Sequence, residues 1–344
     1  SVPPYAAVSQ SVDLARAAKV GRAAGLVNAV LQAFARGWRE VRFPDPATDP
    51  VEYLVTWGSH PRWLVVRWLD RFGFEETRAL VEANNRRPEL YLTPIGISPS
   101  EAVHRLRDSG ITADTVERFP DSLALRPPAG PAEALAAVPG VIQDPAAAAV
   151  VRFGGFRDAD VAIDLAAAPG GKTVGLATRA GYVAAADVSL GRLRRVRSNV
   201  ERLGLGERVG LVVADGRHPP FRPVQAVLLD APCTGTGTLR RHPDGRWRLS
   251  PADLEALVAL QGELLDAAAQ LVAPGGTLVY ATCSLEPEEN ERQVERFLAA
   301  NPAFRSRAPD EPFDGTMLIG DFLAILPQRH GVDGAFAALL QRVT

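Results

Sequence analysis

Cysteine, lysine and methionine are scarce in this sequence. Among 344 residues there are two cysteines (Cys233 and Cys283), two lysines (Lys19 and Lys172) and one methionine. No apolar run approaches the ~20 residues that a membrane-spanning helix needs, and no secretory leader is visible. We therefore expect a cytoplasmic protein with no membrane partner. A reducing compartment also argues against a structural disulfide.

An excess of either charge is also lacking. The formal net charge is −2, and nearly all of the basic residues are arginines. Any nucleic-acid binding must therefore come from local patches and not from the field of the whole chain. The length allows two or three domains, and the composition is that of an ordinary globular protein.

Three patterns divide the chain. Residues 1–86 carry apolar residues at helical spacing, and the opening letters, SVPPYAAVSQ, read as the interior of a domain whose start is absent. Residues 87–145 predict a small α+β module, for which a spacer and a nucleic-acid-binding role are both open. Residues 146–344 predict five βα units and a terminal hairpin turning at Gly331–Gly334. This alternation indicates an α/β fold with a doubly wound, mostly parallel sheet.

The two cysteines end two apolar runs. AVLLDAPCTGTG (226–237) places Asp230 and Cys233 after one predicted strand, and GTLVYATCS (276–284) places Cys283 after another. Ligands of open α/β sheets gather at these carboxyl ends. A single cysteine is most often a small buried hydrophobe. Two at equivalent strand ends, flanked by Asp-x-Pro and by Thr and Ser, favour an active site with two thiols.

A glycine loop, DLAAAPGGKT, follows the first predicted strand of this sheet. Ala166 stands where a P-loop needs its first glycine, and Lys172 stands where a dinucleotide fingerprint needs its second. Acids end the next strands, and Asp187 has the place of a ribose ligand. These features predict S-adenosylmethionine, which has a ribose, an adenine and a charged amino-acid tail. The expected cofactor-binding residues are Ala166, Ala167, Ala168, Pro169, Gly170, Gly171, Lys172, Asp187, Asp215 and Asp230.

Seven motifs occur in a recognisable order: DLAAAPGGKT, AADVS, VVADGR, LLDAPCTGTG, RRHPDGRW, YATCSLEPEENE and LPQRHGVDGAFAALL. Together they resemble the RNA cytosine-5 methyltransferases of the Sun (Fmu) family over about residues 140–343. GLVNAVLQAF and the stretch from Trp57 to Pro94 are similar to the bacterial 16S ribosomal RNA methyltransferase B branch, which has a NusB-like helical domain. The family usually has cysteine at the position of Ala166. Because the backbone is implied to contact the cofactor there, we expect binding to persist.

The resemblance implies a Rossmann-like methyltransferase that methylates carbon 5 of a cytosine in RNA, with 16S ribosomal RNA as the expected partner. It gives Cys283 the role of attacking thiol, Cys233 that of resolving the adduct, and Asp230 that of binding the base edge. Covalent addition at carbon 6 is what makes carbon 5 nucleophilic. We expect a monomer without a metal.

Alternatives differ in their sequence signatures. DNA cytosine methyltransferases use one Pro-Cys thiol, and amino-group methyltransferases use Asn/Asp-Pro-Pro-aromatic without a thiol. A non-catalytic, cofactor-binding ribosome assembly factor remains as a rival.

Arginines of the 240–248 loop could help Cys283 to ionise. Candidates for phosphate contacts and base stacking, unless they form a solvated basic face, are Arg192, Arg194, Arg195, Arg197, Arg240, Arg241, Arg246 and Trp247.

Overall fold

The computed structural model describes residues 3–18, 20–40, 42–157 and 159–343. Its contacts divide the chain into two compact units, Ser1–Ser59 and His60–Thr344, which are described separately. No helix among the described residues is long and apolar enough to cross a membrane.

The first unit is helical. Pro4 begins its first helix and Asp49 caps its last, where the Asp49 side chain accepts from the Glu52 amide. The two longest helices of the unit pack against each other. Its elements are α1 (Pro4–Ala17), η1 (Gly21–Ala23), α2 (Ala24–Gly37), η2 (Trp38–Glu40) and α3 (Pro50–Thr56).

The second unit begins with α4 (Arg62–Asn85), which is interrupted at Gly73, where φ is +75°. A glycine adopts this conformation without steric cost. Leu64, Trp68 and Leu80 on this helix are fully buried. By its contacts α4 therefore belongs with the larger unit, whereas the sequence pattern groups it with the helices before it.

A small antiparallel sheet follows, with strand order β2-β3-β1-β4 and its own core around Leu92, Leu106 and Leu123. Ser98 caps the first helix that covers it. This module comprises β1 (Leu90–Pro94), α5 (Pro99–Asp108), β2 (Ala113–Val116), β3 (Phe119–Leu125), α6 (Pro131–Ala137) and β4 (Gly140–Ile142). The α+β character of this stretch agrees with the prediction, although β2 and β4 were not recognisable from the sequence.

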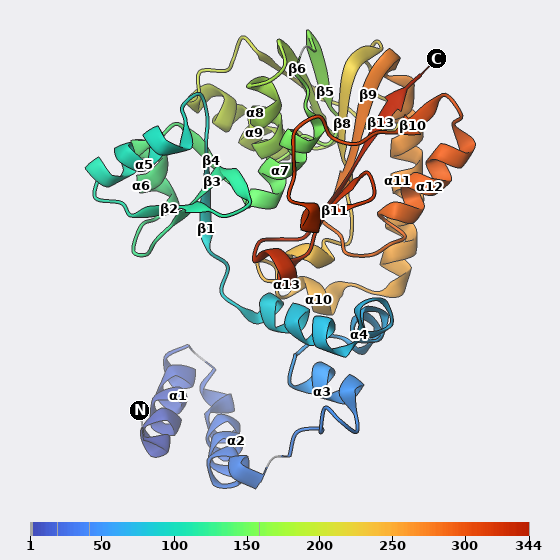
Figure 1. The fold of residues 1–344 in the computed structure, drawn as a ribbon. Helices are drawn as coiled ribbons and strands as arrows, with labels where there is room; N and C mark the ends of the chain where they lie inside the picture. Colours follow the sequence, from blue (N-terminus) through green and yellow to red (C-terminus); the bar gives the residue numbers. More distant parts are fainter. Residues whose placement is uncertain (1–2, 19, 41, 158, 344) are drawn as a thin grey trace. The chain divides into compact units, whose positions relative to one another are not determined.

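The largest sheet has the strand order β11-β12-β13-β9-β8-β5-β6-β7, with β10 paired to β13 (Figure 1). The five strands from β9 to β7 are parallel, and β13 is antiparallel to β9. Its strands are β5 (Val161–Asp164), β6 (Tyr182–Asp187), β7 (Val209–Val213), β8 (Val224–Asp230), β9 (Val272–Thr282), β10 (Phe304–Ser306), β11 (Leu318–Ile319), β12 (Phe322–Ile325) and β13 (Ala335–Arg342). The predicted α/β fold is confirmed.

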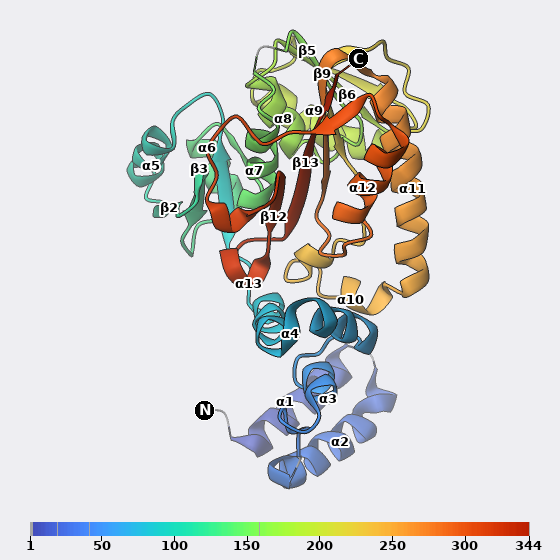
Figure 2. The same cartoon turned by 45° about the vertical axis from the view of Figure 1, so that its right-hand side comes forward.

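Helices cover both faces of this sheet (Figure 2). Ala226 and Leu228 pack in the core with α7, α8 and α9, while Val227 and Leu229 pack in the core with α11 and α12. Burial on both faces is why β8 is a continuous apolar run. The helices are α7 (Pro145–Gly154), α8 (Gly171–Ala177), α9 (Leu190–Arg202), η3 (Thr236–Thr238), α10 (Gly245–Arg248), α11 (Pro251–Gln270), α12 (Glu291–Ala300), η4 (Gly315–Met317) and α13 (Pro327–His330).

The predicted terminal hairpin is wrong in its connection. β12 and β13 do pair in antiparallel fashion, but α13 lies between them. Pro327 starts this short helix, and Gly331, with φ of +70°, ends it. The Gly331–Gly334 segment therefore follows a helix and is not a two-residue turn between strands.

Candidate active site

The two thiols meet at the carboxyl end of the parallel sheet. β8 and β9 are neighbours, with Asp230 paired to Ala281, so the loops that follow them leave the sheet side by side. Cys233 Sγ lies 3.4 Å from Cys283 Sγ, and the Cys283 amide donates to Cys233 Sγ, also at 3.4 Å. Both cysteines are free and half-buried.

Hydrogen bonds hold the two thiol loops together. The Thr234 amide donates to the buried Glu289 carboxylate at 2.9 Å, and Thr234 Oγ1 lies 3.1 Å from Ser284 Oγ. The Gly237 amide donates to the Cys283 carbonyl at 3.0 Å. A Cβ on Gly237 would lie 2.7 Å from the Gly334 Cα, so only glycine allows this approach.

The two thiols affect each other's ionisation. The side-chain hydrogen bond between them, together with burial and the nearby charges of Cys283 and Glu289, raises the pKa of Cys233 well above its usual range. The two sulfurs are therefore unfavourable as two thiolates at once. Burial lowers the pKa of Lys172, but the Asp230 carboxylate at 2.7 Å outweighs burial, and the charge of Cys283 acts in the same direction, so the net pKa is raised. Lys172 is therefore a cation paired with Asp230.

The glycine loop lines a cavity of about 240 Å³ beside this pair. Gly170 has a φ of +104°, and a Cβ on it would lie 3.0 Å from the Val196 Cα of α9. A Cβ on Gly171 would clash with Gln143 Oε1. These two glycines let the backbone form the wall of the cavity. The predicted residues that line it are Ala166, Ala167, Ala168, Pro169, Gly170, Gly171, Lys172 and Asp230.

Asp164 also lines the cavity and was missed in the sequence. It ends β5 and is 1% exposed. Thr173 Oγ1 donates to its Oδ2 at 2.7 Å, while its Oδ1 is buried without a hydrogen-bond partner among the described residues. Burial raises the pKa of Asp164 to about 7, with the Thr173 bond acting in the opposite direction. The signal for it was an acid ending the strand before the glycine loop.

Two predicted acids lie outside that lining. Asp187 is buried beneath the loop, where its carboxylate accepts from the Ala168 amide at 3.3 Å and from the Ser189 amide at 2.9 Å. Asp215 is half-buried and paired with Arg217 at 2.7 Å. The side-chain hydrogen bond from Arg217 lowers the pKa of Asp215 to about 2. In the structure, Asp230 thus lines the cavity with the glycine loop, Asp187 lies below that loop, and Asp215 is paired with Arg217.

The arginines expected to contact phosphate fall into two groups. Arg240 and Arg241 each bridge Asp144 and Asp333, with nitrogen–oxygen distances of 2.5–2.7 Å. The Arg240 side chain is only 9% exposed. This cluster fastens the Cys233 loop to the start of α7 and to the loop before β13. Both arginines are thus engaged within the protein, and their contact with phosphate and their help to Cys283 stay predictions. The charge of Lys172 also interacts with that of Cys283.

Arg246 is also buried, donating to Asn85 Oδ1 at 2.8 Å and to the Asn84 carbonyl at 3.2 Å, so it too is engaged within the protein. Trp247 remains exposed. The α9 arginines are different, because Arg194, Arg195 and Arg197 lie on its solvent side. Arg192, which precedes them, reaches Asp187 at 3.5 Å.

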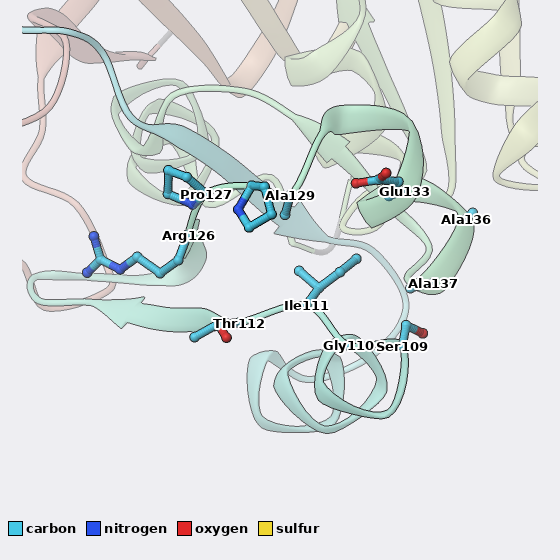
Figure 3. A pocket seen from close by; sticks show the side chains of 11 residues that line it. Ser109, Gly110, Ile111, Thr112, Arg126, Pro127, Ala129, Glu133, Ala136 and Ala137 are labelled. Carbon is cyan, nitrogen blue, oxygen red and sulfur yellow. The ribbon is translucent and has the colours of Figure 1, made fainter.

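A further hollow, of about 500 Å³, lies in the small module (Figure 3). Its two charged side chains are already engaged. Arg126 binds Asp114 and Glu89, and Glu133 accepts from the Gly130 amide. Apolar and backbone groups make up most of the remaining wall, so chemistry is concentrated at the thiols and the glycine loop. The described residues contain no cluster that could hold a metal ion.

Comparisons with known proteins agree with this geometry. The family 16S rRNA methyltransferase RsmB/F matches residues 155–341, its ferredoxin-like domain matches residues 60–130, and the NusB family matches residues 1–36. The ribosomal RNA small subunit methyltransferase B of Cronobacter sakazakii is 37% identical over 329 residues, covering 92% of this chain and 72% of the relative. The chain belongs to the RsmB/F family.

Solved structures share its fold. A methyltransferase homolog protein from Pyrococcus horikoshii superposes with a TM-score of 0.73 at 27% identity, covering 87% of this chain and all of that one (100%). NSun6 from Pyrococcus horikoshii, solved with SFG, gives a TM-score of 0.69 at 22% identity and covers 83% of this chain and 98% of its own. This RsmB/F member is an RNA methyltransferase that uses S-adenosylmethionine.

Proposed function

We propose that this enzyme methylates carbon 5 of a cytosine in 16S ribosomal RNA through a covalent cysteine adduct. The observation that carries the proposal is the 3.4 Å approach of Cys233 and Cys283 beside the Lys172–Asp230 pair. The two sulfurs are in contact, and negative charge on one disfavours ionisation of the other, so the two are suited to different tasks.

The cavity residues fit the expected methyl donor. The orphaned Asp164 Oδ1 would accept from the ammonium of its amino-acid tail, and the backbone of Ala166–Gly171 would follow the ligand closely. Asp187 would hold the ribose hydroxyls, and we propose Asp215 for the adenine side of the site. When bound, S-adenosylmethionine supplies the electrophilic methyl group.

Cytosine carbon 5 is a poor nucleophile, which explains the need for a thiol. The Cys283 sulfur forms a bond to carbon 6, and the ring electrons move toward carbon 5 and N3. Asp230, held by Lys172, would accept from the N4 amino group of the base, and the Lys172 ammonium would offset the negative charge that develops toward N3. Carbon 5 then takes the methyl group. The carbon 5 proton then passes to a base, a role that we propose for the Cys233 sulfur in its thiolate form. The electrons of that C–H bond restore the aromatic ring as the sulfur–carbon bond breaks and Cys283 leaves as a thiolate.

RNA must reach this cleft with the target base out of its stack. We propose that residues 87–145 bind RNA, residues 1–86 form a NusB-like region and residues 146–344 catalyse. The family's ferredoxin-like domain matches residues 60–130 and so includes α4 with the small module, while the NusB family matches residues 1–36. We further propose that the enzyme acts as a monomer in the cytoplasm.

Labelled methyl transfer tests the function directly. The full chain is incubated with methyl-labelled S-adenosylmethionine and with unmodified 16S ribosomal RNA, and the product is digested to nucleosides. Label in 5-methylcytidine, lost in Cys283→Ala, is the expected result. Label in another nucleoside would overturn the assignment of carbon 5 of cytosine as the methylated atom. Cofactor binding without any transfer, to naked RNA or to small-subunit assembly intermediates, would favour the assembly-factor alternative.

A further inference from the structure

The segment that follows Cys283 is bound by α4, a helix from outside the methyltransferase sheet. Glu286, only 1% exposed, accepts from Arg67 Nε at 2.7 Å and from Trp68 Nε1 at 3.1 Å. Arg67 and Trp68 are more than 200 positions away in the chain. A carboxylate buried this deeply is costly unless it is paired, so Glu286 and α4 fix each other's place.

Further contacts extend along the same segment. Arg67 Nη2 also binds Glu288 at 2.6 Å. One turn later, Arg71 donates to the Leu285 carbonyl and binds Glu291 at 2.8 Å. The chain between Cys283 and α12 is thus held by two arginines and a tryptophan of one helix.

The contact is transmitted to the thiol within three residues. The Glu286 amide donates to Ser284 Oγ at 2.9 Å, and Ser284 Oγ lies 3.1 Å from Thr234 Oγ1 in the Cys233 loop. The far end of α4 contacts α10, which follows the Cys233 loop in the chain, because Arg246 donates to the Asn84 carbonyl and to Asn85 Oδ1. α4 therefore binds the segment after Cys283 directly and the chain after Cys233 through α10.

We propose that α4 positions the nucleophile, with Arg67 and Glu286 as the positioning residues for Cys283. Neither side chain needs to touch the substrate. Their ion pair, in which the Glu286 side chain is buried, sets where the Cys283 backbone lies relative to Lys172 and Cys233. This inference rests on the proposed function, in which Cys283 attacks carbon 6.

Arg67→Met tests the pair while keeping an apolar stem of similar length. Displacement of a catalytic group by about 1 Å lowers rates by roughly a hundredfold, so we expect kcat to fall by about ten- to a hundredfold. The KM for RNA and the affinity for S-adenosylmethionine should stay unchanged, because neither site contains Arg67. Glu286→Gln, which keeps an acceptor for Trp68, should show the same split, and Arg67→Lys should recover part of the rate.

Arg78→Met is the matched control on the same helix. Arg78 contacts only Glu75, Glu82 and Phe74, all within α4, among the described residues. Its kcat should equal that of the unaltered enzyme. Equal rates for Arg67→Met and Arg78→Met would overturn the proposal. So would a loss of cofactor affinity parallel to the loss of rate, since that result indicates general loosening.

Iodoacetamide labelling of Cys283 in a Cys233→Ala background tests the positioning of Cys283 by α4 separately from its proposed role as nucleophile. If Arg67→Met changes this labelling rate and Arg78→Met does not, the helix positions the thiol. If Cys283→Ala still methylates RNA, the proposed nucleophile is wrong, yet the labelling result stands. If Cys283→Ala is inactive while Arg67→Met keeps its rate of both labelling and turnover, the positioning inference alone fails.

Discussion

Cys233 Sγ and Cys283 Sγ lie 3.4 Å apart, although the two residues end different strands. Adjacent parallel strands deliver their following loops to one edge of the sheet, and the register of β8 and β9 brings Asp230 level with Ala281. The site is therefore a product of strand order. Lys172, from the loop after β5, completes it because β5 is the other neighbour of β8.

The charge cluster beneath the Cys233 loop makes a stability prediction. Asp333 is buried and pairs with Arg240 and Arg241. Asp333→Ala leaves buried guanidinium charge short of a partner, which costs about 3–5 kcal/mol of unfolding free energy. Urea unfolding of the variant and of the unaltered protein measures this loss of unfolding free energy. Asp314→Ala breaks the more exposed Arg118–Asp314 pair, together with the bonds from Asp314 to Thr316, and should cost less. Equal losses in the two variants would contradict the account.

Much of this fold follows from local sequence patterns. The run from Ala226 to Leu229 is apolar at every position because both faces of β8 are covered, and Ser250 with Asp253 forms the capping box that starts α11. The strand-end placement of Cys233 and Cys283 needs only the alternation of strands and helices. Its consequence, that the two thiols meet, needs the strand order as well.

The contacts that local sequence patterns did not predict depend on residues that are far apart in the chain. Arg240 and Arg241 look like surface arginines until Asp144 and Asp333, from two distant loops, are brought to them. Asp164 looks like any strand-end acid until burial leaves one oxygen without a partner. Local spacing contains no information on such pairings, which arise only when the elements pack.

Asp187 should matter for cofactor affinity. Its carboxylate holds the Ala168 and Ser189 amides and is proposed to bind the ribose. Hydrogen bonds to charged groups contribute about 1.5–3 kcal/mol, so Asp187→Asn should weaken S-adenosylmethionine by roughly ten- to a hundredfold. Calorimetry gives the dissociation constant. Asp215→Asn should weaken it less, because Arg217 already engages that carboxylate. Unchanged affinity in Asp187→Asn would remove the ribose assignment.

Asp164 should couple cofactor binding to pH. Burial raises its pKa to about 7, so the folded protein favours the neutral acid. The stability that the neutral Asp164 contributes is fully present below its unfolded-state pKa and is lost as pH rises through 7. An ammonium at its free Oδ1 would favour the carboxylate and lower the pKa. Binding at pH 6 should therefore release a proton, and affinity should rise toward pH 7 and then level off. Calorimetry in two buffers of different ionisation enthalpy detects the proton, and Asp164→Asn should abolish its release.

The exposed arginines of α9 should contribute to RNA binding. Arg194, Arg195 and Arg197 lie on its solvent side. Each contact to a single-stranded phosphate adds about 0.7 to the slope of log affinity against log salt, so replacing all three by glutamine should reduce that slope by roughly 2. Filter binding over a salt series measures the slope. Replacing Arg78, Arg292 and Arg305 removes equal charge from other elements and should change it less. The same reduction in both triple variants would show a general effect of net charge.

The two thiols should be separable by the covalent complex that each variant leaves. Cys283→Ala removes the attacking sulfur, so no RNA adduct should form. Cys233→Ala should still attack and transfer methyl, and then stall, so that the protein accumulates cross-linked to RNA as a slow band on a denaturing gel. The double variant should lose that band. Turnover is abolished in every case, so activity alone cannot assign the roles. A band in Cys283→Ala that depends on Cys233 would reverse them.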